Sequence, residues 1–340
     1  MNIISDALKA SVKAYCAAIG TDPLLVQGAG GNASWKEGNI LWVKASGTWL
    51  ADAAEKNIFV PVDLLHLRNA IGSGSFSVTP KLRGESTLRP SIETLLHALM
   101  PHRVVVHLHA IEILAYLVRD DCQTAFQCLL DPSINWTMVE YHKPGADLAK
   151  ALNMSLFQKP MSNVIFLESH GVVIGGENVT EVANILNKLT STLSISPLTS
   201  IINNNKLMPP AMFTQYSPVH DENINQLALN VNLFQRLNKE WVLYPDHVVF
   251  LSIRAYTYNS WHDFSEKNNI NNEHPELIFI KEHGVFVKPT FNRAKRAQLR
   301  CYADILTRQN SDSNIKTLSE IQISELLNWD AEKYRQHMSV

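Results

Sequence analysis

The chain has 340 residues, enough for one large domain or two domains of moderate size. Hydrophobic residues make up 46% of it and charged residues 18%, a balance typical of globular proteins rather than disordered or coiled-coil ones. The net charge of -2 and the pI near 6.7 exclude the basic surface that nucleic-acid binders need. We therefore expect a small-molecule partner and no nucleic acid.

Neither a signal peptide nor a membrane span is predicted, because the first residues lack a positive segment and the apolar residues after them are interrupted by charge. The cysteines are Cys16, Cys122, Cys128 and Cys301, with no zinc-type spacing such as C-x-x-C. We interpret them as reduced thiols, which favours a cytoplasmic protein without a membrane partner.

The N-terminal segment predicts a helix, a glycine-rich loop and a strand. Apolar residues at helical spacing predict a helix over residues 5–18 that ends at Gly20. The glycine-rich segment 27–35 follows, and a turn then leads into a strand over 40–44. A dinucleotide-binding loop would open a helix instead, so we disfavour a Rossmann fold.

This loop and the next turn are candidates for anion binding. Glycines let backbone amides converge on an anion, and Asn32 and Ser34 add side-chain donors. After the strand, Ser46 and the amide of Gly47 could complete a phosphate cradle, with Lys44 as a further candidate. The alternative is a tight hairpin that needs glycine only for its turn.

Residues 60–71 predict a short strand and a helix, and the polar segment 79–88 predicts a loop. A helix is then predicted to begin at Ser91, a good N-cap residue, and to end before Pro101. Glu93 lies in its first turn, where the helix dipole alone would favour a carboxylate.

The segment that follows contains a candidate metal-binding pair. The β-branched residues 104–106 predict a buried strand, and a helix is predicted over 110–117. His107 and His109 are two residues apart, so in an extended chain their imidazoles point to one face and can reach one ion. A catalytic metal site needs about three protein ligands, and His170 is the best candidate for the third.

Four further elements complete the first half. We predict a helix over 146–154, strands over 163–167 and 172–174, and a helix that ends near Leu193. Ser, Thr, Asn and Pro then dominate residues 194–218, which is the best candidate for a domain boundary.

Five elements are predicted beyond this boundary. They are a helix over 222–239, a strand over 248–251, a loop over 261–275, a strand over 277–280 and a helix over 292–307.

Two segments of this second half resemble segments of the first. Residues 277–285 resemble residues 164–172, which lie 113 residues earlier, and residues 245–249 resemble 101–105. The second comparison places Leu251 and Ile253 where the first half has its histidine pair. We therefore expect no second metal site, and we interpret His283 as a structural turn residue.

Five sequence blocks resemble the class II aldolase/adducin family in their order and spacing. They are Gly-Gly-Asn-Ala-Ser, Ala-Ser-Gly-Thr, Pro-Ser-Ile-Glu-Thr, Val-His-Leu-His and Ser-His-Gly-Val-Val, between residues 5 and 193. The resemblance implies a three-layer α/β/α fold around a central mixed, largely antiparallel sheet, in a homo-oligomer that is most often a tetramer. We expect this domain over residues 1–195, a linker over 196–218, and over 219–340 a C-terminal α/β extension that could be a degenerate half-repeat.

The resemblance also implies roles for the motif residues. His107, His109 and His170 would bind Zn²⁺, or another divalent metal such as Mn²⁺, Co²⁺ or Fe²⁺, and Glu93 would be the catalytic acid/base. The residues that would bind the substrate phosphate are Gly31, Asn32, Ser46, Gly47 and Ser91. Ile92 departs from the pattern, because aldolases of the family usually have a hydroxyl residue there, and no tyrosine proton donor can be placed.

The activity that follows is that of a metal-dependent aldolase, a carbon–carbon lyase acting on a sugar phosphate or related ketose through a metal-stabilised enediolate. An epimerase or dehydratase of the same family is an alternative, although family epimerases tend to have aspartate at the position of Glu93. A non-enzymatic, adducin-like binding module is another, although such members typically lose the ligand histidines.

Overall fold

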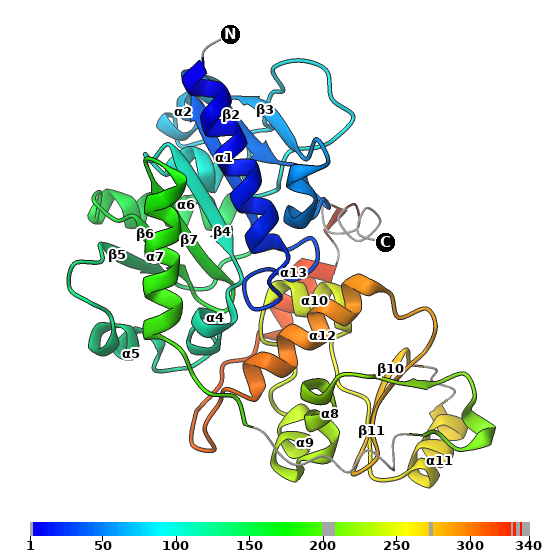
Figure 1. The fold of residues 1–340 in the computed structure, drawn as a ribbon. Coiled ribbons are helices and arrows are strands. Elements are labelled where there is room, and N and C mark those ends of the chain that lie inside the picture. The colour runs from blue at the N-terminus through cyan, green and yellow to red at the C-terminus, as the bar shows by residue number, and fades with distance from the viewer. Residues whose placement is uncertain (1–2, 199–207, 272–274, 328, 331–333, 335–340) are drawn as a thin grey trace.

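A seven-stranded mixed sheet forms the centre of the N-terminal half, in the order β3-β2-β1-β4-β7-β6-β5 (Figure 1). Neighbouring strands are antiparallel except β5 and β6, which are parallel. The strands are β1 (Asn32–Glu37), β2 (Ile40–Lys44), β3 (Phe59–Asp63), β4 (Val104–Leu108), β5 (Trp136–Val139), β6 (Val164–Leu167) and β7 (Gly171–Gly176). The computed structural model describes residues 3–198, 208–271, 275–327, 329, 330 and 334.

Helices cover both faces of this sheet. On one face lie α1 (Ile3–Gly20), α4 (Ile111–Leu117), α5 (Cys122–Leu129) and α7 (Val179–Thr192), and on the other α2 (Leu64–Gly72), α3 (Thr94–Leu99) and α6 (Ala146–Gln158). The 3-10 helix η1 (Leu50–Ala54) packs against α1.

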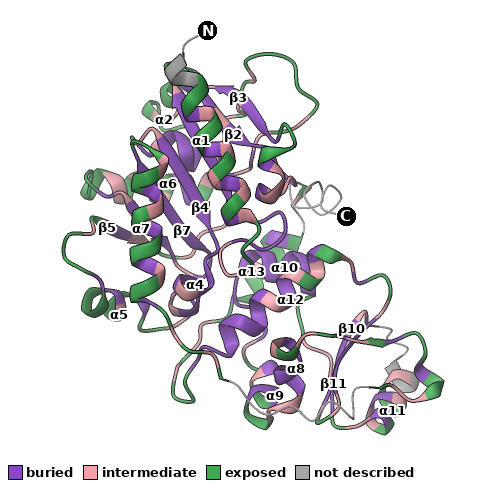
Figure 2. Cartoon of the chain, in the orientation of Figure 1, coloured by how far each residue is buried: buried purple, intermediate pink, exposed green. Residues whose placement is uncertain are grey.

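Strand β4 shows how the two faces are divided. Val104 and Val106 pack with α1, α4 and α7, whereas Val105 packs with α2, α3 and α6. Alternate side chains of a strand point to opposite faces, so both faces of β4 are apolar. Figure 2 shows the strands buried between the layers and the exposed residues on the outer surfaces of the helices. The predicted three-layer α/β/α fold is confirmed.

Most elements predicted for this half are present, but the helix expected to begin at Ser91 begins at Thr94. The Ser91 hydroxyl accepts a hydrogen bond from the backbone amide of Glu93 at 3.2 Å, and the backbone carbonyl of Ser91 accepts one from the backbone amide of Thr94 at 3.1 Å. These bonds form a turn in place of the first helical turn. Glu93 is therefore the N-cap residue, but its side chain makes no cap hydrogen bond. Helix α5 and strand β5 were not predicted.

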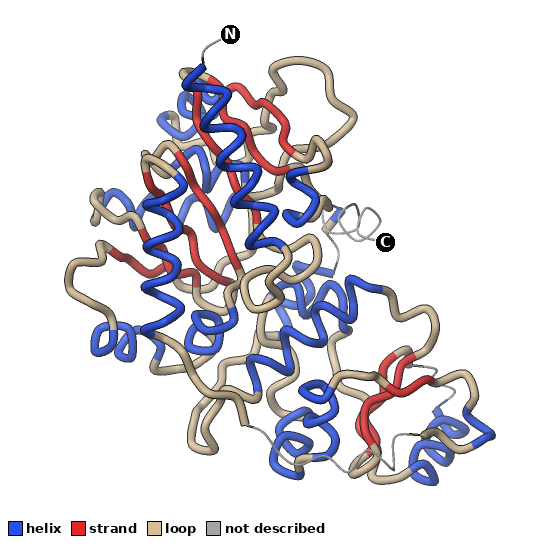
Figure 3. The backbone as a smooth tube through the Cα atoms, viewed as in Figure 1, coloured by secondary structure: helices blue, strands red, loops and turns tan. Residues whose placement is uncertain are grey.

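A second, four-stranded sheet lies in the C-terminal half, in the order β8-β11-β10-β9 (Figure 3). Its strands are β8 (Ser217–Pro218), β9 (Thr257–Tyr258), β10 (Leu277–Ile280) and β11 (Gly284–Val287). The helices of this half are η3 (Ala211–Phe213), α8 (Glu222–Leu229), α9 (Val231–Leu237), α10 (Pro245–Leu251), α11 (Trp261–Asn271), α12 (Arg293–Leu306) and α13 (Glu320–Leu327). None of the described helices of the chain is long and apolar enough to cross a bilayer.

The second sheet repeats the connectivity of four strands of the first. The order β8-β11-β10-β9 corresponds to β4-β7-β6-β5, and in each set the last two strands are parallel. The β10–β11 hairpin has the register of the β6–β7 hairpin, shifted by 113 residues. Both turns hold a non-glycine residue with positive φ at the same position, 50° at Ser169 and 61° at Glu282. The resemblance between these two segments thus extends to their backbone conformation.

Several predictions for the C-terminal half are wrong. Residues 248–251 belong to helix α10 and not to a strand, because a short apolar run has no periodicity that separates the two structures. A helix, α11, begins at Trp261 where a loop was predicted, and Asn230 divides residues 222–239 into α8 and α9. Strand β8 lies within the predicted linker 196–218. It was not predicted, because two residues are too few for a recognisable pattern.

The position of β8 also changes the correspondence between the histidines. The pairings of β4 with β7 and of β8 with β11 align Pro218 with His107. His220 then takes the place of His109, which the sequence comparison had assigned to Ile253. The second sheet therefore lacks a histidine at the first position. Within the described parts of the chain, only the first sheet gathers three potential metal ligands.

The two halves are joined by a shared core and by polar contacts. Helix α12 packs against α4, and one apolar cluster includes Leu114 of the first half and Leu299 of the second. Arg308 forms an ion pair with Glu112 at 3.0 Å, with side-chain exposures of only 6% and 12%. A buried pair of this kind is costly to break, because the remaining charge is left in a poorly solvated place.

We predict that Arg308→Met lowers the free energy of unfolding by about 3 kcal/mol, because it leaves the Glu112 carboxylate without its partner. Urea denaturation followed by circular dichroism measures the change.

The control is Lys188→Met, which breaks the ion pair between Lys188 and Asp131. The side chains of these two residues are 43% and 46% exposed. It should cost less than about 1 kcal/mol, since exposed pairs contribute little. Equal losses in the two variants would contradict a special role for Arg308 between the halves.

Candidate metal centre

Three buried imidazoles converge at one end of the first sheet. His107 is in β4, His109 follows the end of that strand, and His170 lies in the turn between β6 and β7. Strand β4 pairs directly with β7, so this turn lies beside the strand end. The candidate ligand atoms of the three residues all lie within 4.8 Å of one another. The structure thus brings together the three histidines that the sequence analysis singled out.

In two of these histidines the proton lies on Nδ1, so the lone pair of Nε2 is left facing the centre. The Nδ1 of His107 lies 3.1 Å from the carbonyl oxygen of Val172, which can only accept, so His107 carries its proton on Nδ1. The Nδ1 of His109 lies 3.4 Å from an oxygen of Asp246, which favours the same tautomer. Such partners on the second ring nitrogen are typical of metal-ligating histidines.

The distance between these two Nε2 atoms fits a metal ion. They lie 3.2 Å apart, and with both protons on Nδ1 they present lone pairs to each other and cannot form a hydrogen bond. Two nitrogens bound at about 2.0–2.1 Å to a tetrahedral ion lie about 3.3–3.4 Å apart. A cation between them would turn a repulsive contact into two bonds, so the donor set fits a divalent metal.

The Glu93 carboxylate faces the same centre. One oxygen lies 3.3 Å from the Nε2 of His170 and the other 3.5 Å from the Nε2 of His107. The second oxygen accepts a hydrogen bond from the Asn32 amide at 2.8 Å. The first has no hydrogen-bond partner among the described residues, although it is buried.

The charges of these groups leave a negative site that a cation would balance. Burial lowers the pKa of His107, and it lowers the pKa of His170 to about 3, so both imidazoles are neutral at pH 7. Burial raises the pKa of Glu93, but the attraction of these two histidines, which take up protons only in the same acidic range, and the Asn32 amide outweigh it and hold this pKa below its usual range, so the carboxylate is ionised at pH 7. An ionised carboxylate among neutral imidazoles is the environment in which a divalent ion binds well.

His97, which the sequence analysis did not select, holds Asn32 in place. Its Nε2 contacts the side-chain carbonyl of Asn32, and its Nδ1 lies 2.7 Å from the Ser34 hydroxyl. The carbonyl can only accept, so Nε2 carries the proton and Nδ1 accepts from Ser34. Burial lowers the pKa of His97 to about 3, which keeps it neutral. The Asn32 amide is thereby directed at Glu93. No local pattern in the sequence marked His97, because its partners Ser34 and Asn32 lie 63 and 65 residues away along the chain.

The two donor-rich turns predicted to bind an anion lie side by side. The buried Lys44 ammonium donates to the carbonyls of Ala29, in the first turn, and Thr48, in the second, at 3.1 and 2.6 Å. Gly31 and Gly47 have φ of 64° and 78°, which explains why glycine is needed at both positions. Lys44 thus joins the two turns and adds a positive charge between them.

A small cavity connects this cradle to the metal centre. It is lined by Ala29, Gly31, Asn32, Lys44, Ser46, Gly47, Ser91, Ile92, Glu93 and His109. The structure therefore places all five predicted phosphate-binding residues together with Glu93 and one histidine. The cavity volume is about 20 Å³, room for about one water molecule. Ile92, where the resemblance expects a hydroxyl residue, contributes an apolar side chain.

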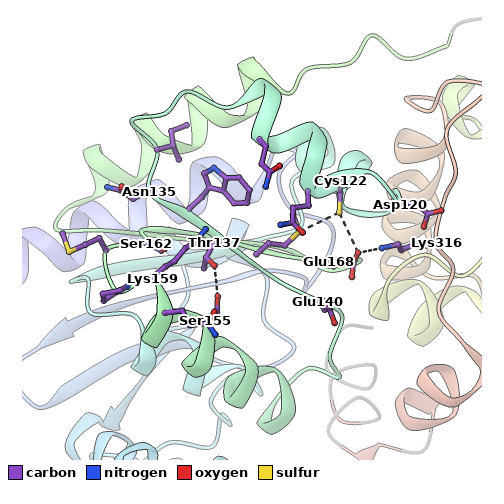
Figure 4. A pocket seen from close by; sticks show the side chains of 18 residues that line it. Asp120, Cys122, Asn135, Thr137, Glu140, Ser155, Lys159, Ser162, Glu168 and Lys316 are labelled. Atoms are coloured by element: carbon purple, nitrogen blue, oxygen red, sulfur yellow. Dashed lines mark hydrogen bonds and ion pairs between the residues drawn. The ribbon is translucent and has the colours of Figure 1, made fainter.

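A much larger pocket lies elsewhere, at strand β5. Its volume is about 1040 Å³. Figure 4 shows Glu168 between Cys122 and Lys316, and below them the hydrogen bond between the hydroxyls of Thr137 and Ser155. Glu168 is 2.5 Å from Lys316 and 3.8 Å from the Cys122 sulfur. None of the metal-centre residues lines it. Glu93 and His109 line the small cavity instead.

We predict that Gly171→Ala disturbs the metal centre. A Cβ at Gly171 would lie 2.4 Å from the Leu108 carbonyl oxygen and 3.0 Å from the His109 ring, so the backbone beside both histidines must shift. Overpacking of this kind costs about 1–3 kcal/mol. Thermal unfolding and metal binding of the purified variant should both weaken.

Gly72→Ala is the matched control, because a Cβ there meets no atom within 4 Å. It should unfold at the wild-type temperature or slightly above it. Wild-type metal binding in Gly171→Ala would show that the close approach to Leu108 is not needed.

Comparisons with known proteins place the N-terminal half of this chain in a family. A sequence model of the class II aldolase and adducin N-terminal domain matches residues 12–196, more than half of the chain. Among curated proteins, the uncharacterized oxidoreductase YuxG of Bacillus subtilis is 29% identical over 175 residues, which are 47% of this chain and 25% of that protein. The aligned part of this chain thus spans about a quarter of that relative.

Solved structures similar to this chain include the N-terminal class II aldolase domain of a conserved protein from Thermoplasma acidophilum, at 27% identity and a TM-score of 0.46, covering 54% of this chain and 90% of that one. Another is the L-fuculose-1-phosphate aldolase of Thermus thermophilus, at 16% identity and a TM-score of 0.38, covering 55% and 91%. The sequence match over residues 12–196 identifies this chain as a member of the class II aldolase and adducin family.

Proposed function

We propose that this protein is a divalent-metal-dependent aldolase that breaks or forms a carbon–carbon bond in a sugar phosphate or related ketose. The observation that carries the proposal is the convergence of His107, His109 and His170 on one point that the Glu93 carboxylate also faces. Three imidazoles with one open position are typical of a catalytic zinc site. Bound there, the ion would act as a Lewis acid that stabilises negative charge developing on substrate oxygens.

Glu93 is the group proposed to move the proton. Its carboxylate is ionised at neutral pH, and one oxygen is held by Asn32 while the other has no hydrogen-bond partner among the described residues. A fixed carboxylate with one oxygen available can accept a proton from the substrate and return it. The bonds from Ser34 through His97 to Asn32 support this orientation, because they fix the Asn32 amide.

The cradle is proposed to hold an anionic end of the substrate, most simply a phosphate. The Lys44 charge, the Ser46 hydroxyl and the Gly47 amide favour an anion there, and Glu93 and His109 line the same cavity. Binding energy from a phosphate held away from the reacting carbons orients them at the metal. The cavity must widen for this, because its present volume of about 20 Å³ does not accommodate a sugar phosphate.

The test of the activity is a screen of phosphorylated and free ketoses with the zinc-loaded protein. An aldolase releases an aldehyde, a dehydratase releases water, and an epimerase gives a product of unchanged mass. The coupled detection of aldehyde and mass spectrometry of the same samples therefore separate the three reactions. The family resemblance also predicts a homotetramer, which native mass spectrometry can measure in the same preparation.

We expect the purified protein to take up close to one divalent ion per chain. His170→Ala should abolish this uptake, because it removes one of three ligands. Metal analysis after dialysis against zinc and removal of free ion gives the stoichiometry.

His283→Ala is the control, since His283 occupies the corresponding turn of the second sheet and its Nδ1 lies 2.8 Å from the Lys281 carbonyl. It should retain the metal. Retention of the metal by His170→Ala as well would remove the proposed site.

We expect Glu93→Gln to keep the metal and to lose turnover by about 10²–10⁴-fold, because the amide cannot accept the proton. The assay is the initial rate on the best substrate of the screen, with metal content measured on the same samples.

Glu168→Gln removes a carboxylate from the larger pocket of Figure 4 and should leave turnover near the wild-type value. Wild-type activity in Glu93→Gln would exclude the proposed acid/base role. A loss confined to Glu168→Gln would move the chemistry to that pocket.

A further inference from the structure

We infer that Asp246, in the C-terminal half of the chain, is a positioning residue for the metal ligand His109. This inference rests on the proposed metal site. It adds to that site a residue outside the region 12–196 that the family model matches.

Asp246 is held at the centre by its own half of the chain. It is the second residue of α10, and it is only 2% exposed. One of its oxygens lies 3.4 Å from the Nδ1 of His109, and the side-chain amide of Gln298, in α12, donates to this same oxygen at 3.2 Å. Two helices of the second half therefore fix the carboxylate beside a histidine of the first.

The glycine-rich loop leaves room for this contact. A Cβ at Gly30 would lie 3.1 Å from the Asp246 oxygen, 3.2 Å from the Nδ1 of His109 and 2.9 Å from the Gln27 carbonyl. Only a residue without a side chain lets the loop, the end of β4 and helix α10 meet so closely. The Gln27 carbonyl of the loop itself gives the closest clash, and the contact between Asp246 and His109 adds to it.

The charge of Asp246 has a definite effect on its neighbour. A buried carboxylate beside Nδ1 favours the proton on that nitrogen, so Nε2 keeps the lone pair that faces His107 and His170. The carboxylate also makes the imidazole a stronger donor and limits rotation of the ring. Removal of an outer partner of this kind typically costs about 10–100-fold in metal affinity.

The element that carries Asp246 is an addition to the repeated connectivity. In the first half, α5 leads directly to β5, whereas α10 lies between α9 and β9 in the second. Because β8 has Pro218 in place of His107, the second sheet lacks a complete histidine set of its own. The second half instead supplies one carboxylate to the centre of the first.

The test compares Asp246→Asn with the wild type in metal binding. Competition with a chromophoric chelator should show Co²⁺ or Zn²⁺ affinity reduced by about 10–100-fold. At saturating Co²⁺ the visible spectrum of the variant should differ from that of the wild type, because the donor strength of His109 has changed. Asp246→Glu, which keeps the charge, should recover part of the affinity. Thermal unfolding of the metal-free variant should match the metal-free wild type.

Asp263→Asn is the control, since Asp263 is a carboxylate of the same half that pairs with Lys267 at 3.0 Å, away from the centre. It should bind metal as the wild type does. Wild-type affinity in Asp246→Asn would overturn the inference. So would a wild-type cobalt spectrum combined with lower metal-free stability, which would make Asp246 merely structural. If the wild type binds no metal, both the proposed function and this inference fail. If the wild type binds metal, His170→Ala loses it and Asp246→Asn binds it with wild-type affinity, only the role of Asp246 is refuted.

Discussion

The pairing of β4 with β7 is the contact on which the candidate centre depends. It places the strand end that carries His107 and His109 beside the hairpin turn that carries His170. Both faces of β4 are buried in apolar cores, so its register is strongly specified. A slip by one residue would turn His107 into the core under α1, α4 and α7 and bring a valine to the metal position. The same burial that stabilises the sheet therefore defines which side chains form the site.

Much of this arrangement could be predicted from the sequence, because it is encoded by local patterns. The two-residue spacing of His107 and His109 fixed their common face, and the glycines of the cradle indicated a loop whose backbone amides could converge on an anion. The parts that could not be predicted are contacts between distant segments. Lys44 joins two turns through their carbonyl oxygens, and Asp246 reaches His109 from another half of the chain. No pattern near either residue announces such a contact.

The C-terminal half shows a second limit of sequence reasoning. Its β10–β11 hairpin was recognisable, because its length and its apolar residues match those of β6–β7. The strand that completes the match, β8, has only two residues, and the apolar run in α10 resembled a strand more closely than β8 did. Short elements are fixed by their neighbours rather than by their own composition, so only the three-dimensional pairing identifies Pro218 as the counterpart of His107.

The smallness of the central cavity has a consequence for the rate at which the protein can work. With space for about one water molecule, the cavity is too small in this conformation for a sugar phosphate, so a substrate of that size would have to wait for its walls to separate. Opening and reclosing typically take microseconds to milliseconds, and such motions often limit turnover in enzymes with covered sites. Walls that close over a bound substrate would also keep bulk water from the carbanion-like species of the proposed reaction. In the proposed mechanism, protection of the chemistry and speed of exchange would thus be set by the same walls.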